Sequence, residues 1–166
     1  MKINPGDVIL YSSNGAWWDK FIHLASSTTH VSFAISDSQV VEANSKGVVL
    51  VDFDPAWVCQ ICRIDGMNER WAKMGRDFAV KHIGDKYSVW TAIKAGILRI
   101  LGLTEVADEI DMNWDCSEFV GAILRNGIGL PICPRIGLVS LVPDHLIDGI
   151  DEFNKSGGIE KWASLI

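Results

Sequence analysis

The spacing of apolar residues changes once along this chain, near Ile64, and this change limits the possible folds more than any other feature of the sequence. Before Ile64 the apolar runs are short, rich in β-branched residues and separated by turn residues. Tight turns at 36–38 and 44–47 predict an antiparallel meander. We expect its strands over 8–11, 30–35, 40–44, 48–53 and 57–64, with a short helix over 16–25 after the first.

After Ile64 the apolar residues recur at the spacing of helices. We expect helices over 68–82 and 89–103. The apolar face of the first is predicted to hold Trp71, Met74, Phe78 and His82, and that of the second Trp90, Ile93, Ile97, Ile100 and Leu101, both facing the core.

A third helix is indicated at both of its ends. Asp115 and Glu118 form a capping-box pair at its start, and Gly127 is the residue expected to end it. Shorter helices are expected from Pro143 and over 159–165. Strands followed by helices, without βαβ alternation, predict an α+β fold.

Length and charge restrict the partners. The chain has 166 residues, of which 48% are hydrophobic, and it contains no repeat or linker, so one domain over 1–166 is expected. Fifteen Lys and Arg against 21 Asp and Glu give a net charge of −6, which argues against nucleic acid as a partner. No apolar run suggests stable membrane insertion, and the turn-like start, rather than an apolar leader, predicts synthesis in the cytoplasm. Later delivery to the envelope stays open.

Each of the four cysteines needs its own explanation. Cys59 and Cys62 form a C-x-x-C, but in a strand these positions point to opposite faces, which is poor geometry for chelation. Cys116 and Cys133 do not supply a second ligand pair at comparable spacing. We therefore expect neither a metal ion nor a cofactor.

Cys116 is the candidate nucleophile. As the first residue of the third helix it lies beside unpaired backbone N–H groups and the positive end of the helix dipole, which stabilise a thiolate. The N–H groups of Cys116 and Ser117 could form part of an oxyanion hole. Because Asp115 at the N-cap partly offsets the dipole, the thiol still requires a base.

His30 is the favoured base among four histidines. It opens a strand on which His30, Ser32 and Ala34 share one face, and the small residues beside it suggest that this face lines a cleft. Ordinary structural roles are expected for His23, His82 and His145.

These residues also resemble a known family. The segment from Asp115 to Val120, Asp-Cys-Ser-Glu-Phe-Val, resembles the nucleophile motif of NlpC-type papain-like cysteine peptidases. In their circularly permuted branch the histidine precedes the cysteine, as here. Further similar blocks, extending to about residue 146, are Gly6–Ile9, Thr29–Ser32, Val41–Ala43, Gly84–Tyr87 and Pro143–Leu146.

The resemblance implies a permuted papain-like fold, in which a small antiparallel sheet with the base packs against the helix with the thiol. It implies that Cys116 attacks an amide or ester carbonyl while His30 transfers the protons. The expected substrate is a cell-wall peptide or another acylated small molecule. Asp115 and Ser117 are expected to hold a substrate amine, although a capping role would also explain both. Tyr87 is expected in the core or in the wall of the cleft.

The residue that orients His30 depends on strand register. Glu42 shares a face with His30 only if the turn at 36–38 pairs residues of equal parity, for example Ile35 with Gln39. Otherwise a backbone carbonyl, a water molecule or a displaced Asn44 would have to orient the ring. We expect Glu42, mainly because of the family resemblance.

Two other functions are compatible with this sequence. Lecithin retinol acyltransferase-like enzymes resemble the same permuted arrangement, so an acyltransferase or thioesterase acting on lipid-like acyl groups is one alternative. The helix over 89–103 would then face lipid, although its apolar face suits the core better. The other alternative is a binding module in which Cys116 is buried and inert.

Overall fold

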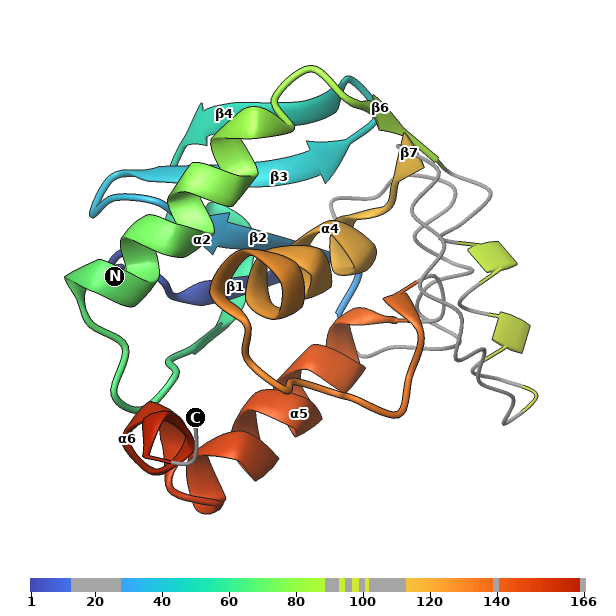
Figure 1. Cartoon of the computed structure of the whole chain (residues 1–166). Helices are drawn as coiled ribbons and strands as arrows, with labels where there is room; N and C mark the ends of the chain where they lie inside the picture. Colours follow the sequence, from blue (N-terminus) through green and yellow to red (C-terminus); the bar gives the residue numbers. More distant parts are fainter. Residues whose placement is uncertain are drawn as a thin grey trace.

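The chain adopts an α+β fold in the computed structural model, which describes residues 1–12, 28–88, 93–94, 97–98, 101, 113–138 and 141–164 (Figure 1). The helix expected over 16–25, with His23, lies outside the described residues, as does most of the one expected over 89–103. Within the described parts, the structure has no helix with the length and apolar character needed to cross a membrane.

Five strands form one antiparallel sheet in the order β4-β3-β2-β1-β5. The meander expected from the sequence is confirmed for the first four strands, but the fifth returns to pair with β1 at the opposite edge. A short 3-10 helix, η1 (Pro55–Trp57), precedes this fifth strand. The strands are β1 (Val8–Tyr11), β2 (His30–Ala34), β3 (Gln39–Asn44), β4 (Gly47–Asp52) and β5 (Val58–Cys62).

The turn between β2 and β3 pairs residues of equal parity, which is the alternative that puts Glu42 on the same face as His30. Phe33 pairs with Val41, and the Ile35 N–H donates to the Gln39 carbonyl at 3.0 Å, so the turn has three residues, 36–38. Because paired residues in this register have equal parity, the odd and even positions of β2 face the same sides as those of β3. His30 and Glu42 therefore lie on one face.

The two faces of the sheet contribute to separate apolar clusters. On one face, Val31, Phe33 and Val41 belong to the main core with the helices. On the other, Ile9 and Ala34 belong to a smaller cluster. His30 and Glu42 share this second face, near the end of the strands.

Helix α2 (Glu69–Lys81) is capped by Asn68, whose side-chain oxygen accepts from the N–H groups of Arg70 and Trp71. The apolar face expected from the sequence is partly wrong, since Met74 is exposed and the buried residues are Ala72, Gly75 and Ala79. The helix lies so close to the sheet that a Cβ at Gly75 would come within 2.8 Å of the Phe33 ring. Small residues at the contact make this approach possible.

Helix α4 (Cys116–Ala122) begins at Asp115 with the predicted capping box. It continues as a π-helical segment, η2 (Ile123–Ile128), which ends at Gly129 with φ of 89°. The expectation that Gly127 ends the helix is therefore wrong. Gly127 instead permits close packing against α2, because a Cβ there would lie 2.7 Å from the Cβ of Phe78.

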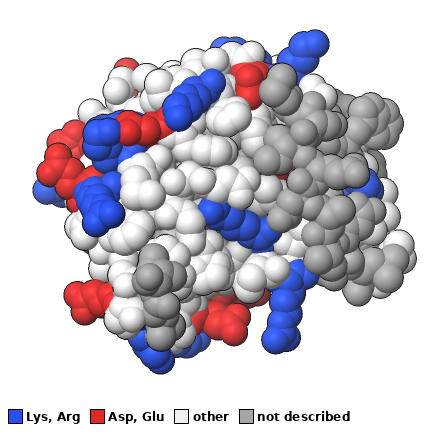
Figure 2. Space-filling model, viewed as in Figure 1, with Lys and Arg blue, Asp and Glu red and all other residues white. Residues whose placement is uncertain are grey.

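The C-terminal part forms α5 (Pro143–Lys155) and α6 (Gly158–Ala163), both near their expected positions. Figure 1 shows α2 and α4 over the same side of the sheet, with α5 and α6 on the side of β1, below it in this view. On the described part of the face in Figure 2, basic and acidic side chains are interspersed and form no continuous basic surface.

A small parallel pair joins the sheet to the start of α4. Its strands are β6 (Lys86–Tyr87) and β7 (Asn113–Trp114). Just before β6, the Asp85 carbonyl accepts from the N–H of Val48 in β4, while its carboxylate accepts from Trp114 Nε1 at 3.0 Å. Asp85 thus connects the β3–β4 hairpin to the residue two positions before Cys116.

Substitution of Gly47 would test the contact between the β3–β4 turn and Asp85. The φ of Gly47 is 104° and a Cβ would lie 2.4 Å from the Asp85 carbonyl oxygen, whereas Gly84, with φ of 96°, has no atom within 4 Å of such a Cβ. We expect Gly84→Ala to lower the free energy of unfolding by about 1–2 kcal/mol through backbone strain alone. Gly47→Ala should cost clearly more. Equal losses in urea unfolding would show that the contact with Asp85 contributes nothing.

Candidate active site

Cys116 opens α4 and is 4% exposed. The preceding residue, Asp115, is extended and accepts from the Glu118 N–H through Oδ1 at 2.8 Å, while the Asp115 N–H donates to Glu118 Oε2. This capping box fixes the first turn, and with it the position of the Cys116 side chain. Glu118 is therefore folded back on its own helix.

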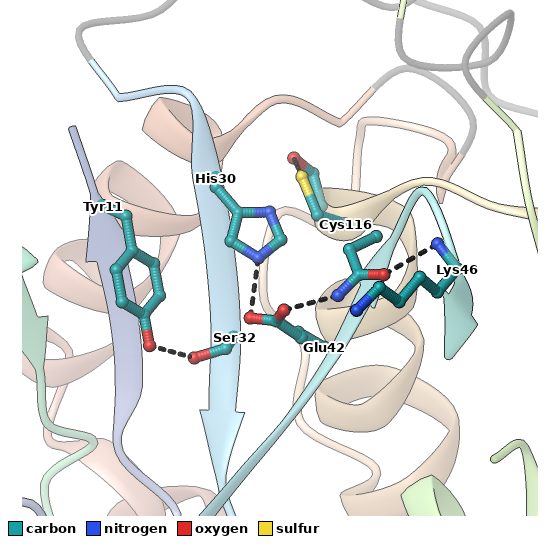
Figure 3. Close-up of polar contacts among 8 residues, drawn as sticks. Tyr11, His30, Ser32, Glu42, Lys46 and Cys116 are labelled. Carbon is teal, nitrogen blue, oxygen red and sulfur yellow. Dashed lines mark hydrogen bonds and ion pairs between the residues drawn. The ribbon is translucent and has the colours of Figure 1, made fainter. Parts of the chain in front are cut away.

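His30 lies between Cys116 and Glu42 (Figure 3). Its Nε2 is 2.9 Å from Glu42 Oε2, and its other ring nitrogen is on the side of Cys116. Burial lowers the pKa of His30, but hydrogen bonding and charge from Cys116 and Glu42 raise it to about 10. The imidazolium is therefore the favoured form of this ring at neutral pH, with a sulfur at one nitrogen and a carboxylate at the other.

Glu42 is brought to His30 by the three-residue turn described above. Burial acts to raise the pKa of its carboxyl, but His30 and a hydrogen bond from Asn44 hold that pKa below its ordinary value. The side chains of His30 and Glu42 are 27% and 16% exposed. Both side chains are thus mostly sheltered from water without being fully buried.

Two further side chains lie beside this pair: Tyr11, which the sequence did not single out, and Asn44, which it offered only as an alternative partner of His30 and which contacts Glu42 instead. Tyr11 is opposite His30 in the β1–β2 ladder, with ring centroids 5.5 Å apart, and its hydroxyl bonds to Ser32 at 2.9 Å. Burial raises the pKa of Tyr11 to about 12, so the phenol stays neutral. Asn44 donates to Glu42 Oε1 at 2.7 Å. The positions of Tyr11 and Asn44 beside His30 follow from the register of the strands, which the sequence did not determine.

Asp115 has an unusual carboxyl. Oδ1 caps the helix, but Oδ2 is buried and has no hydrogen-bond partner among the described residues. Burial raises the pKa of Asp115 to about 7, against the N–H groups of Glu118 and Ser117. A buried, unpartnered oxygen beside the thiol is a ready acceptor for a donor from outside the chain.

The expected oxyanion donors differ in availability. The Ser117 N–H already interacts with the Asp115 carboxyl. The Cys116 N–H has no acceptor among the described residues, as is usual in the first turn of a helix. The Ser117 hydroxyl lies 3.9 Å from Cys116 Sγ. The oxyanion role of both backbone groups stays a prediction.

The remaining residues singled out in the sequence have other contacts. Tyr87 is opposite Trp114 in the β6–β7 pair and packs against the main core. His82 bonds to Asp85 through Nδ1 at 2.8 Å, and His145 Nδ1 accepts from the Val142 N–H, so both have structural partners.

The other thiols differ from Cys116. In β5, Cys59 is exposed and Cys62 is buried, as expected for positions on opposite faces. Burial raises the pKa of both Cys62 and Cys133 to about 11. Among the described residues, no group of three or more His, Cys, Asp or Glu is arranged to hold a metal ion.

Asp115 predicts a pH-dependent stability. Because its pKa is raised from 3.8 to about 7, the folded state binds a proton that the unfolded state has lost between those values. The unfolding free energy should therefore fall as pH rises from about 4 to about 7, by up to about 1.4 kcal/mol per pH unit. Asp115→Asn keeps the capping oxygen and should remove this contribution.

The matched control is Asp77→Asn. Lys73 holds the pKa of this exposed carboxyl below its ordinary value, so its own titration lies at more acid pH. Urea unfolding across this range measures both variants against the original chain. If Asp115→Asn leaves the slope unchanged, the carboxyl is ionised throughout and a substrate or solvent partner must be sought for it.

The site's interpretation depends on its own geometry. No model of a protein family matches this chain, and no curated protein matches it. The observations that carry the chemistry are the start of α4, the first residue of β2 and the β2–β3 register. Together they place an imidazole between a thiol and a carboxylate in space (Figure 3).

Proposed function

We propose that this chain is a cysteine hydrolase that cleaves an amide bond through a thioacyl-enzyme, on a permuted papain-like fold. The observation that carries the proposal is the His30 ring, which has Cys116 on one side and Glu42 bonded at 2.9 Å on the other. A nucleophile, a base and a group that orients the base are the minimum set for this chemistry.

In the first half-reaction, Cys116 Sγ attacks the substrate carbonyl carbon and the carbonyl oxygen takes the negative charge. The Cys116 N–H donates to this oxygen. As the carbonyl re-forms and the C–N bond breaks, the His30 imidazolium gives its proton to the leaving amine. Glu42 stabilises the imidazolium and fixes the ring.

In the second half-reaction, neutral His30 takes a proton from water, and the resulting hydroxide adds to the thioester carbon. The C–S bond then breaks, Cys116 leaves as the thiolate, and the acyl group departs as a carboxylic acid. His30 is again an imidazolium. No external oxidant, reductant or cofactor enters this cycle.

The substrate proposed is a cell-wall peptide or another acylated small molecule. The buried Oδ2 of Asp115, without a partner among the described residues, supports an amine-bearing substrate, because an ammonium group would satisfy this oxygen. Tyr87 pairs with Trp114, two positions before Cys116, and is proposed to contribute to the wall of the substrate site.

Thiol reactivity tests the proposed nucleophile. We expect iodoacetamide to modify Cys116 at about pH 6.5, because the His30 imidazolium stabilises the thiolate there. His30→Ala should slow this reaction by about tenfold or more. Intact mass and peptide mapping measure the rate and the position.

Cys59→Ser provides the control, since it removes an exposed thiol that has no contact with the proposed site. It should leave the Cys116 rate unchanged. A Cys116 thiol that reacts only after unfolding, or at the same rate without His30, would contradict the proposal and favour a binding module.

A second function is favoured by one observation. Ile97 and Leu101, which were expected to face the core, are 52% and 63% exposed. The prediction that they pack in the core is therefore wrong, and exposed apolar residues suit an enzyme that takes lipid-like acyl groups. An acyltransferase or thioesterase on the same Cys116–His30 pair is the alternative.

Product analysis separates the two functions. We expect peptide amides to be hydrolysed in water alone, because water completes the second half-reaction. Long-chain acyl esters and muropeptides should be compared with and without a primary amine acceptor, by mass spectrometry of the products. Acyl turnover that needs the acceptor would replace hydrolysis by acyl transfer as the function.

A further inference from the structure

We propose that Asn44 is a positioning residue, which holds the Glu42 carboxylate in the orientation that accepts the hydrogen bond from His30. This inference rests on the proposed Cys116–His30–Glu42 site and adds to it a residue that does not touch the reacting atoms.

The two oxygens of Glu42 have separate partners. Oε2 is 2.9 Å from His30 Nε2, and Oε1 accepts from Asn44 Nδ2 at 2.7 Å (Figure 3). Rotation of the carboxylate about its last bond would lengthen both contacts, so each bond restrains the other. With the Glu42 side chain only 16% exposed, water competes poorly for either oxygen.

Asn44 is itself fixed by the β3–β4 turn. Its Oδ1 accepts from the Lys46 N–H at 2.9 Å, and the residue pairs with Gly47 at the end of the ladder. Because the amide oxygen is taken by Lys46, the amide nitrogen must face Glu42. The turn therefore imposes a donor at this position.

The turn is also held from outside. The Asp85 carbonyl accepts from the Val48 N–H at 2.9 Å, and the Val48 carbonyl accepts from the Gly84 N–H at 2.9 Å. Continuing the β2–β3 register from Phe33 and Val41 places Asn44 opposite His30. A firmly held amide thus lies on the same sheet face as the ring and the carboxylate.

The substitution Asn44→Asp distinguishes two roles of Asn44: holding the Glu42 carboxylate and stabilising the β3–β4 turn. The new side chain has nearly the same shape and keeps the oxygen that accepts from Lys46, but it loses the N–H groups. Two carboxyls in contact share one proton at low pH, so the bond to Glu42 persists there, and both ionise at higher pH, so the bond is lost. A positioning role therefore predicts a defect that appears only as pH rises.

The matched control is Gln39→Glu. Gln39 is on the same strand and donates its side-chain amide to Asp52 Oδ1 at 3.3 Å, so the substitution makes the same chemical change away from His30. Asn44→Ala forms the third variant, because it removes the donor at every pH without adding charge.

The reaction to measure is deacylation after p-nitrophenyl acetate, a probe that forms acetyl-Cys116, followed by intact mass from about pH 5 to about pH 8.5. We expect Asn44→Asp to deacylate like the original chain at the acid end and at least about fivefold more slowly at the alkaline end. Asn44→Ala should be slow throughout, and Gln39→Glu should be unchanged. In parallel, the NMR signal of the His30 Nε2 proton should weaken in Asn44→Asp over the same pH range.

An Asn44→Asp variant that matches the original chain in deacylation and in this NMR signal at every pH would overturn the positioning role. Failure of the original chain to form acetyl-Cys116 would refute the proposed function instead. The His30 signal would then decide the positioning role alone, because it reports the contact with Glu42 without any turnover.

Discussion

The hydrogen bond between His30 and Glu42 depends on the length of one turn. With three residues at 36–38, Phe33 pairs with Val41 and the two polar side chains lie on the same face at a distance of 2.9 Å. A turn longer or shorter by one residue would move Glu42 to the opposite face, into the main core, where an ionised carboxylate is costly. The apolar residues that alternate with His30 and Glu42 therefore select the register that forms the site.

Cys116, the proposed nucleophile, is positioned by a separate set of contacts. Asp115 and Glu118 fix the first turn of α4, and Trp114 is bonded to Asp85. Asp85 also binds β4 through its backbone carbonyl. The sheet, which carries His30, and the β7–α4 segment, which carries Cys116, are therefore joined at Asp85 as well as through the core. These contacts limit how far the sulfur and the ring can move apart.

The carboxylates around the thiol divide into two kinds. Glu42 is held ionised by His30 and Asn44, whereas burial raises the pKa of Asp115 to about 7. In the proposed reaction, Glu42 would stabilise a positively charged His30 ring throughout, whereas Asp115 could change its protonation state when a substrate binds. Two acidic groups with different environments can thus have different roles in one small site.

Much of this arrangement could be predicted from the sequence, because it depends on local patterns. Alternating apolar residues indicated the strands, and Asp115 with Glu118 indicated the start of α4, so the α+β class and the local settings of Cys116 and His30 followed. Long-range packing decided the rest. Gly127 permits contact with Phe78 instead of ending the helix, Met74 is exposed because small residues of α2 face the sheet, and β5 pairs with β1. The sequence by itself determined which side chains could react, whereas register and packing, which join residues distant in the chain, decided that Glu42, Asn44 and Tyr11 surround His30.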